Sequence, residues 1–92
     1  MRTAADVLDR GYEMHPDVSI RPESFGALLY HFGTRRLSFL KDPKLVDVVR
    51  RLPDAPDART ACVGAGVGPG ELASYARSLA TLADTDMIRE RS

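Results

Sequence analysis

Residues 26–43, GALLYHFGTRRLSFLKDP, hold two runs of alternating apolar residues that are joined at Gly33-Thr34. A two-residue loop with glycine is a common connection between antiparallel strands, because glycine readily adopts the positive φ of a type II′ turn. The pattern therefore predicts a β-hairpin with strands at 25–32 and 35–40.

The loop length also sets which residues lie opposite each other in this hairpin. It places Tyr30 opposite Leu37 and Leu28 opposite Phe39, on a face that is apolar and aromatic. We expect this face to pack on the core; its members are Leu28, Tyr30, Phe32, Leu37 and Phe39. The other face carries Ala27, Leu29, His31, Arg36, Ser38 and Leu40. We expect His31 to be solvated there.

A short strand precedes the hairpin at residues 17–21, where Val18 and Ile20 alternate with polar residues. Pro16 and Pro22 flank this strand. Proline lacks a backbone N–H and therefore limits pairing along that edge of the sheet. The opposite edge, formed by the last strand of the hairpin, has no such protection.

Three helices are predicted after the hairpin, at 42–52, 58–63 and 69–83. Asp42-Pro43 is typical of a helix start, because Asp accepts the free amides and Pro suits the first helical position. The helix at 69–83 carries apolar residues at spacings of three and four. The chain is therefore predicted to be α+β, with a three-stranded antiparallel sheet followed by three helices.

A chain of 92 residues is long enough for one domain. We expect that domain at 15–92, after an N-terminal segment at 1–14 that is weakly helical or disordered. Residues 12–16 read as a linker. The predicted core residues are Leu28, Tyr30, Leu37, Phe39, Leu45, Val49, Leu72 and Leu79.

The charge balance argues against a nucleic-acid partner or a membrane partner. The chain has 13 basic and 13 acidic residues, with a formal net charge of +0. Nucleic-acid affinity comes mostly from Lys and Arg, which displace counterions from phosphates. Cys62 is the single cysteine and cannot form an internal disulfide. Because the sequence also has no signal-peptide pattern and no run of membrane-spanning length, we expect a cytoplasmic protein.

The residues that could carry catalysis form no recognisable constellation. The glycine-rich run GAGVGPG at 64–70 has Pro69 where the dinucleotide fingerprint requires glycine, and it lacks the ending of a nucleotide P-loop. His15 and His31 have no ligand cluster around them. We therefore expect no catalytic residue, no metal and no cofactor.

The open edge of the last strand is the feature with functional meaning. In a two-residue hairpin, the backbone groups of Arg36, Ser38 and Leu40 would point away from the partner strand. An open edge beside an apolar helix is typical of a receptor that takes an extended peptide as an added strand. Arg35-Arg36 suits equally a solvated hairpin tip that limits aggregation and a docking point for an acidic peptide.

Residues 19–52, SIRPESFGALLYHFGTRRLSFLKDPKLVDVVRRL, closely resemble the peptide-chaperone family of mycofactocin biosynthesis. That family is similar to the small chaperone of pyrroloquinoline-quinone biosynthesis. Both belong to the recognition elements for ribosomally made, post-translationally modified peptides (RiPP recognition elements). The resemblance is strongest over 21–52. It is looser beyond Pro53, where the segment 53–68 departs from the longer second helix of many relatives, and residues 68–88 resemble the family's last helix.

The resemblance implies a winged-helix-like fold and a peptide chaperone without catalytic activity. Such domains bind the leader of a precursor peptide as a strand beside their third strand, over a groove floored by the last helix. They present it to a radical S-adenosylmethionine maturase, which acts on the C-terminal end of the precursor. Carried over to this chain, the peptide-binding residues are Arg35, Arg36, Leu37, Ser38, Phe39, Leu40, Tyr75, Ser78, Leu79 and Leu82.

Two other functions fit the same predicted architecture. A DNA-binding winged helix would need a basic recognition helix, yet the helix at 69–83 offers only Arg77. A small scaffold or dimerisation module could use the open strand edge to pair with its own copy.

Overall fold

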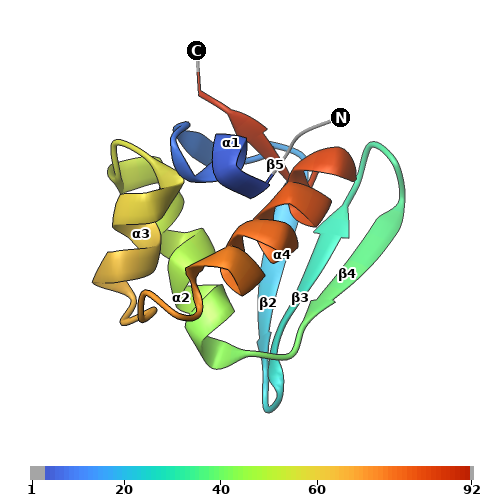
Figure 1. Cartoon of the computed structure of the whole chain (residues 1–92). Coiled ribbons are helices and arrows are strands. Elements are labelled where there is room, and N and C mark those ends of the chain that lie inside the picture. Colours follow the sequence, from blue (N-terminus) through green and yellow to red (C-terminus); the bar gives the residue numbers. More distant parts are fainter. Residues whose placement is uncertain (1–3, 92) are drawn as a thin grey trace.

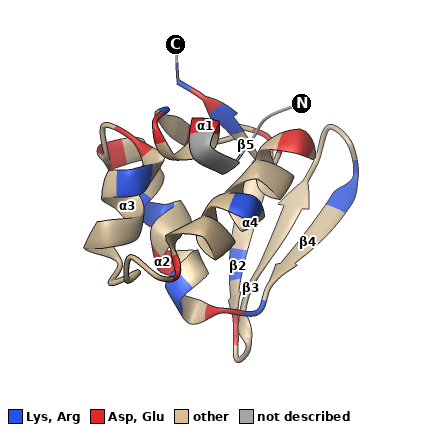
Figure 2. Ribbon diagram, in the orientation of Figure 1, with Lys and Arg blue, Asp and Glu red and all other residues tan. Residues whose placement is uncertain are grey.

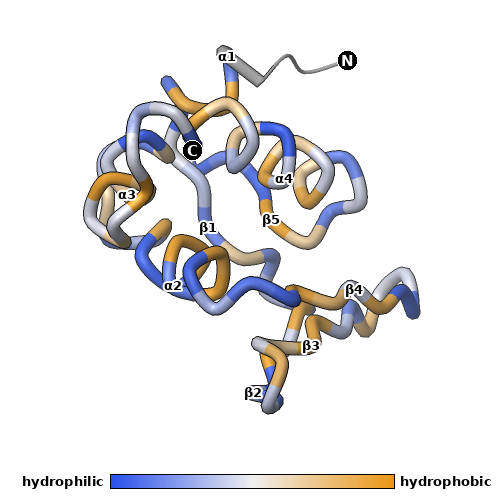
Figure 3. The backbone as a smooth tube through the Cα atoms, turned by 60° about the horizontal axis from the view of Figure 1, so that its bottom comes forward, coloured by the Kyte–Doolittle hydropathy of each residue, from blue (hydrophilic) through white to orange (hydrophobic). Residues whose placement is uncertain are grey.

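The computed structural model describes residues 4–91, which form an α+β fold around a three-stranded antiparallel sheet (Figure 1). This sheet has the order β2–β3–β4, and a second sheet pairs β1 with β5. The helices lie on one side of the three-stranded sheet (Figures 1 and 3). The elements are α1 (Ala4–Leu8), β1 (Tyr12–Met14), β2 (Val18–Glu23), β3 (Gly26–His31), β4 (Arg36–Leu40), α2 (Pro43–Arg51), the 3-10 helix η1 (Leu52–Asp54), α3 (Ala58–Gly64), α4 (Leu72–Asp84) and β5 (Ile88–Glu90).

The predicted strands and helices are present, with boundaries that agree to within three residues. α2 begins as expected, with the Asp42 side chain accepting the Lys44 N–H at 2.9 Å and Pro43 in the first turn. α4 begins at Leu72 because Pro69 and the residues after it remain in a turn. The predicted α+β class is therefore confirmed, whereas the winged-helix-like arrangement stays a prediction.

The hairpin loop has four residues, 32–35, so the predicted two-residue type II′ turn is wrong. The Arg35 N–H donates to the His31 carbonyl oxygen at 2.7 Å, and Arg35, rather than Gly33, has a positive φ of 62°. The predicted register is nevertheless confirmed, with Tyr30 opposite Leu37. It survives because each strand contributes one residue to the longer loop.

The hairpin face that was predicted to be core faces solvent. Leu37 is 53% exposed, Phe39 58% and Phe32 63%. Leu28 and Tyr30, on the same face, are half-buried. The core face is the opposite one, which carries Ala27, Leu29, His31 and Leu40.

Strand β2 explains which face the helices cover. Pairing decides which residues share a face, but it does not decide which face is buried. Val18 lies opposite His31 and Ile20 lies opposite Leu29, so β2 adds its apolar residues to the Leu29 face. Of the other predicted core residues, Val49 and Leu79 are fully buried, and Leu45 and Leu72 are partly buried against the core.

His31 is buried, at 3% exposure, so the prediction of a solvated side chain is wrong. Its Nδ1 accepts hydrogen bonds from the backbone N–H groups of Gly33 at 3.0 Å and Thr34 at 3.1 Å. The ring centroid lies 4.4 Å from that of His15. His31 therefore holds the hairpin loop against β3 through these hydrogen bonds, and its buried ring lies at the loop end of the sheet's core face.

The second sheet pairs β1, which follows α1, with β5 near the other end of the described chain; Tyr12 lies opposite Glu90 and Met14 opposite Ile88. Tyr12 and Ile88 are fully buried. The prediction of a linker at 12–16 is therefore wrong. The predicted boundary between 1–14 and 15–92 stays a prediction, and residues 1–3 lie outside the described chain.

Candidate functional site

A groove of about 280 Å³ lies between β4 and α4. Five of the residues that line it were predicted to bind peptide: Ser38, Phe39, Leu40, Ser78 and Leu82. Leu45 and Thr81 also line it and were missed. The groove is therefore mixed in character: its apolar residues are Phe39, Leu40, Leu45 and Leu82, and hydroxyl groups come from Ser38 on one wall and from α4 on the other.

Strand β4 is an edge strand, and the direction of its free backbone groups follows from the hydrogen bonds of β3. The Phe32 N–H donates to the Asp17 carbonyl oxygen at 2.9 Å, on the β2 side of the sheet. Backbone groups alternate in direction along an antiparallel strand, so those of His31 and Leu29 face β4. The Arg35 N–H, which reaches the His31 carbonyl oxygen from the β4 side, agrees with this arrangement.

The free edge of β4 therefore presents the backbone groups of Leu37 and Phe39. Ser38 and Leu40 direct theirs toward β3, and the Arg36 N–H donates to Thr34 Oγ1 at 3.3 Å, so the prediction that these three point outward is wrong. The loop is the cause, because a change from two to four loop residues keeps the register but exchanges the hydrogen-bonded and non-bonded pairs. No strand within residues 4–91 pairs with the outer edge of β4.

Two predicted peptide-binding residues of α4 lie beneath the surface. Leu79 is fully buried and Tyr75 is 9% exposed. Neither is among the residues that line the groove. Both belong to the core that supports α4, so they position the groove wall and do not form it.

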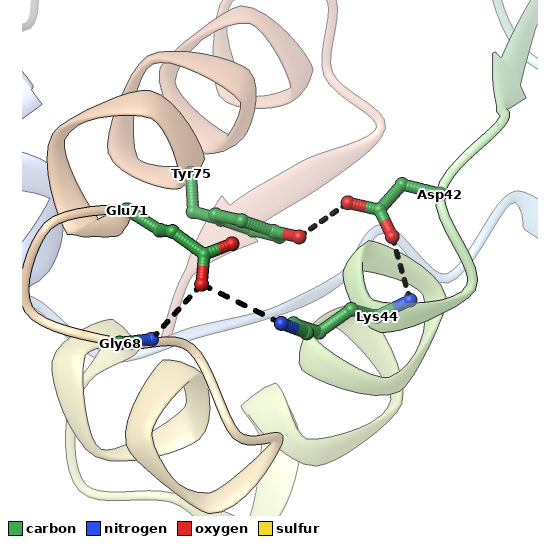
Figure 4. Close-up of polar contacts among 5 residues, drawn as sticks. All are labelled: Asp42, Lys44, Gly68, Glu71 and Tyr75. Atoms are coloured by element: carbon green, nitrogen blue, oxygen red, sulfur yellow. Dashed lines mark hydrogen bonds and ion pairs between the residues drawn. The ribbon is translucent and has the colours of Figure 1, made fainter.

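Polar contacts join the start of α2 to the start of α4 (Figure 4). The Tyr75 hydroxyl donates to the Asp42 carboxylate, whose other oxygen accepts the Lys44 N–H. The Lys44 ammonium lies 3.6 Å from the Glu71 carboxylate. The hydrogen bond from Tyr75 lowers the pKa of Asp42, and the same bond raises the pKa of Tyr75 to about 12. These contacts fix the distance between the two elements that bound one end of the groove.

Arg35 and Arg36 are exposed at the loop end of β4 (Figure 2). They place two positive charges at this end of the strand.

Comparison with known proteins identifies the family. A model of the peptide chaperone MftB family matches residues 11–89, which include both β4 and α4. This chain belongs to the peptide chaperone MftB family. The family's description is that of a chaperone, which is a non-catalytic role.

Three curated relatives carry the same description. The peptide chaperone MftB of Mycobacterium tuberculosis is 53% identical over 83 residues, which cover 90% of this chain and 76% of the relative. That of Mycobacterium ulcerans is 55% identical over 80 residues, covering 87% and 73%. That of Mycolicibacterium smegmatis is 50% identical over 80 residues, covering 87% and 78%. No solved structure matches the chain significantly.

A second hollow in this MftB-family chain, of about 330 Å³, lies between α2, η1 and α3. The sequence did not predict it. Its lining includes Arg50, Arg51 and Asp54.

Other chemistry is sparse in the described chain of this MftB-family member. Among residues 4–91, no three His, Cys, Asp or Glu side chains are grouped so that they could hold a metal ion. Burial raises the pKa of the Cys62 thiol, which disfavours the reactive thiolate. No helix within these residues has both the length and the apolar character needed to cross a membrane.

Proposed function

We propose that this chain is a chaperone of mycofactocin biosynthesis that binds the leader of a precursor peptide along the free edge of β4. The observation that carries the proposal is an unpaired strand edge, with the backbone groups of Leu37 and Phe39 directed outward, beside a groove lined by apolar and hydroxyl side chains. Membership of a peptide chaperone family supports it.

In this proposal the peptide forms a fourth strand of the sheet. Its backbone hydrogen-bonds with Leu37 and Phe39, and these bonds supply affinity without regard to sequence. Every second side chain of the peptide enters the groove, against Leu40, Leu45 and Leu82. Arg35, Arg36, Ser38 and Ser78 offer polar contacts, whereas Tyr75 and Leu79 keep α4 in place.

The bound peptide is then presented to a radical S-adenosylmethionine maturase. Holding the leader at one site makes the encounter of the far end with the enzyme effectively intramolecular, and short tethers reach roughly millimolar effective concentration. Because peptide occupies the β4 edge, the enzyme docks on another surface of the chaperone.

Proline at Leu37 tests the strand addition. Leu37→Pro removes an outward N–H, a change that edge strands tolerate, whereas Leu37→Ala keeps the N–H and is the matched control. We expect Leu37→Pro to bind the fluorescein-labelled precursor peptide about tenfold more weakly than Leu37→Ala, as fluorescence anisotropy would show. Equal affinity of the two variants, both folded by circular dichroism, would show that the edge does not pair with peptide.

Turnover of the precursor tests the presentation step. At peptide concentrations well below saturation, the maturase should modify full-length precursor faster with the chaperone than without it. Leu37→Pro should restore the slow rate. An unchanged rate with the wild-type chain would contradict the chaperone mechanism.

The free edge also permits a second function, which is pairing with the same edge of another copy. Sedimentation of the chain alone and with precursor peptide separates the two. A stable dimer that peptide does not dissociate would favour the dimerisation module.

A further inference from the structure

The outer face of the three-stranded sheet is apolar over β3 and β4, whereas β2 adds the polar residues Ser19, Arg21 and Glu23 to it. Within residues 4–91 several of its large apolar side chains are exposed. In the described chain, the exposed large apolar side chains are Phe25, Phe32, Leu37 and Phe39, together with Val63 on α3. We use the term outer face for Phe25, Leu28, Tyr30, Phe32, Leu37 and Phe39. Exposed apolar patches of this kind usually mark interaction sites.

Aromatic contacts hold this face in a fixed arrangement. The rings of Phe25 and Phe39 have centroids 6.0 Å apart, and those of Tyr30 and Phe32 meet edge to face at 4.8 Å. Such pairs add stability beyond the area they bury. Phe39 is therefore held in place beside the free edge of β4 although it is 58% exposed.

The geometry of an added strand connects this face to the edge. Side chains opposite each other in paired strands lie on the same face of the sheet, with Cβ atoms about 4.5–5.5 Å apart. Peptide residues opposite Leu37 and Phe39 would therefore lie on the outer face, beside these two side chains. The peptide residue opposite Ser38 would instead point into the groove, which Ser38 lines. Phe39 also contacts that groove, so Leu37 is the residue of this pair that belongs to the outer face alone.

We infer that the outer face beside β4 is the second half of the peptide site, and that Leu37 and Phe39 determine specificity there. The inference rests on the strand addition proposed above. The ligand it specifies is a peptide segment with apolar side chains at consecutive positions, so that one alternating set fills the groove and the other packs on Leu37 and Phe39. If the peptide contacted the groove alone, it would need apolar side chains at alternate positions only.

The position of the exposed residues favours the peptide as occupant of this face. Leu37 and Phe39 each combine an outward-directed backbone with an exposed apolar side chain. Any strand that pairs with those groups brings its own side chains beside them, whatever else binds. An enzyme or a second copy on this part of the face would have to contact the peptide as well.

Peptide variants and protein variants together test the inference. The labelled precursor peptide is compared with two versions, each with serine at one of the two alternating sets of apolar positions in the bound segment. They are titrated against the wild-type chain, Phe39→Ser, Leu37→Ser and, as a control with a similarly exposed side chain, Val63→Ser. Circular dichroism confirms that each variant is folded.

We expect both serine-substituted peptides to bind more weakly than the parent. Phe39→Ser and Leu37→Ser should each weaken binding of the parent peptide by up to about fivefold, and Val63→Ser should not change it. Neither sheet variant should weaken binding further when the outward-facing peptide set is already serine, because the contact is then absent.

Other outcomes overturn the inference in distinguishable ways. Parent-like binding by Phe39→Ser and Leu37→Ser, with Leu37→Pro still defective, would leave strand addition intact and assign the outer face to the enzyme or to another copy. A loss that is the same for every peptide would show indirect damage to the edge. Absence of binding by the wild-type chain would overturn the proposed function itself.

Discussion

At the scale of single residues, Tyr75 decides how α4 sits against the start of α2. Its hydroxyl donates to the Asp42 carboxylate, and its ring is buried at the base of α4. The sequence placed Tyr75 in the peptide groove and left it out of the predicted core, so the burial of its ring was not predicted. The hydroxyl's partner could not be predicted, because Asp42 lies 33 residues earlier and already has a local role as the helix cap.

Tyr75→Phe should lower the free energy of unfolding by about 1–2 kcal/mol, because a hydrogen bond to a charged group is lost while the ring remains. Urea unfolding at neutral pH measures this. Ser74→Ala, an exposed neighbour on the same helix, is the control and should leave the stability unchanged. A wild-type value for Tyr75→Phe would mean that the bond contributes no net stability.

The same bond gives a pH dependence. The pKa of Tyr75 is raised from 10.0 to about 12 in the folded chain, so its contribution is full below pH 10 and is lost as the pH rises toward 12. The lowered pKa of Asp42 makes its contribution full above the unfolded value, about 3.9, and lost as the pH falls through the folded value. The stability difference between wild type and Tyr75→Phe should therefore be constant between about pH 5 and 9 and shrink outside that range. A difference that grows above pH 10 would contradict this assignment.

At the scale of elements, the register of the hairpin was predictable and its buried face was not. The alternating pattern fixes which residues share a face within each strand, and the pairing between the strands was kept because each strand gives one residue to the longer loop. Both faces of the hairpin carry apolar residues, so the pattern alone does not show which one is buried. The larger aromatic side chains lie on the exposed face. Val18 and Ile20 of β2 could have indicated the buried face, but only once the β2–β3 register was known.

The groove was predictable in outline from the family resemblance, which named β4 and α4. Thr81 was not predicted because the apolar pattern of α4 marks the core side of the helix, and a threonine beside that side gives no signal of its own. Ser78, Thr81 and Leu82 lie at spacings of three and four and so share a face toward the groove.

The turn between β2 and β3 depends on Gly26. It has a φ of +146°, and a Cβ there would lie 2.0 Å from the Leu40 carbonyl oxygen. Gly26→Ala should therefore cost about 3 kcal/mol or more and loosen β4, because backbone must move. Gly66→Ala, with a φ of +91° but no atom within 4 Å, should cost only backbone strain of about 1 kcal/mol. Thermal unfolding compares the two variants, and equal unfolding temperatures would show that a Cβ at Gly26 causes no clash.

At the scale of the whole molecule, the β1–β5 pair completes the core. It was missed because both strands have three residues and lie at opposite ends of the sequence, so neither shows a pattern of its own. Long-range pairing of this kind depends on tertiary packing more than on local propensity.

Ile88→Ala should lower the free energy of unfolding by about 2–4 kcal/mol, because the side chain is fully buried. Arg89→Ala, in the same strand but in an exposed ion pair with Glu13, should cost well under about 1 kcal/mol. Urea denaturation compares them. Similar small losses of stability in both variants would mean that β5 contributes little to the fold. A separate test is a truncated chain of residues 15–92, whose full stability would support the predicted domain boundary.

Because the backbone groups of β4 alternate in direction, the hydrogen-exchange rates of its successive amides should alternate between slow and fast. In the free chain, the amides of Ser38 and Leu40 face β3, so they should exchange slowly, while those of Leu37 and Phe39 should exchange fast. Saturation with precursor peptide should slow the two fast amides and leave those of Ser38 and Leu40 nearly unchanged. The exchange rates along β4 alone would then show, residue by residue, whether the peptide has paired with its free edge.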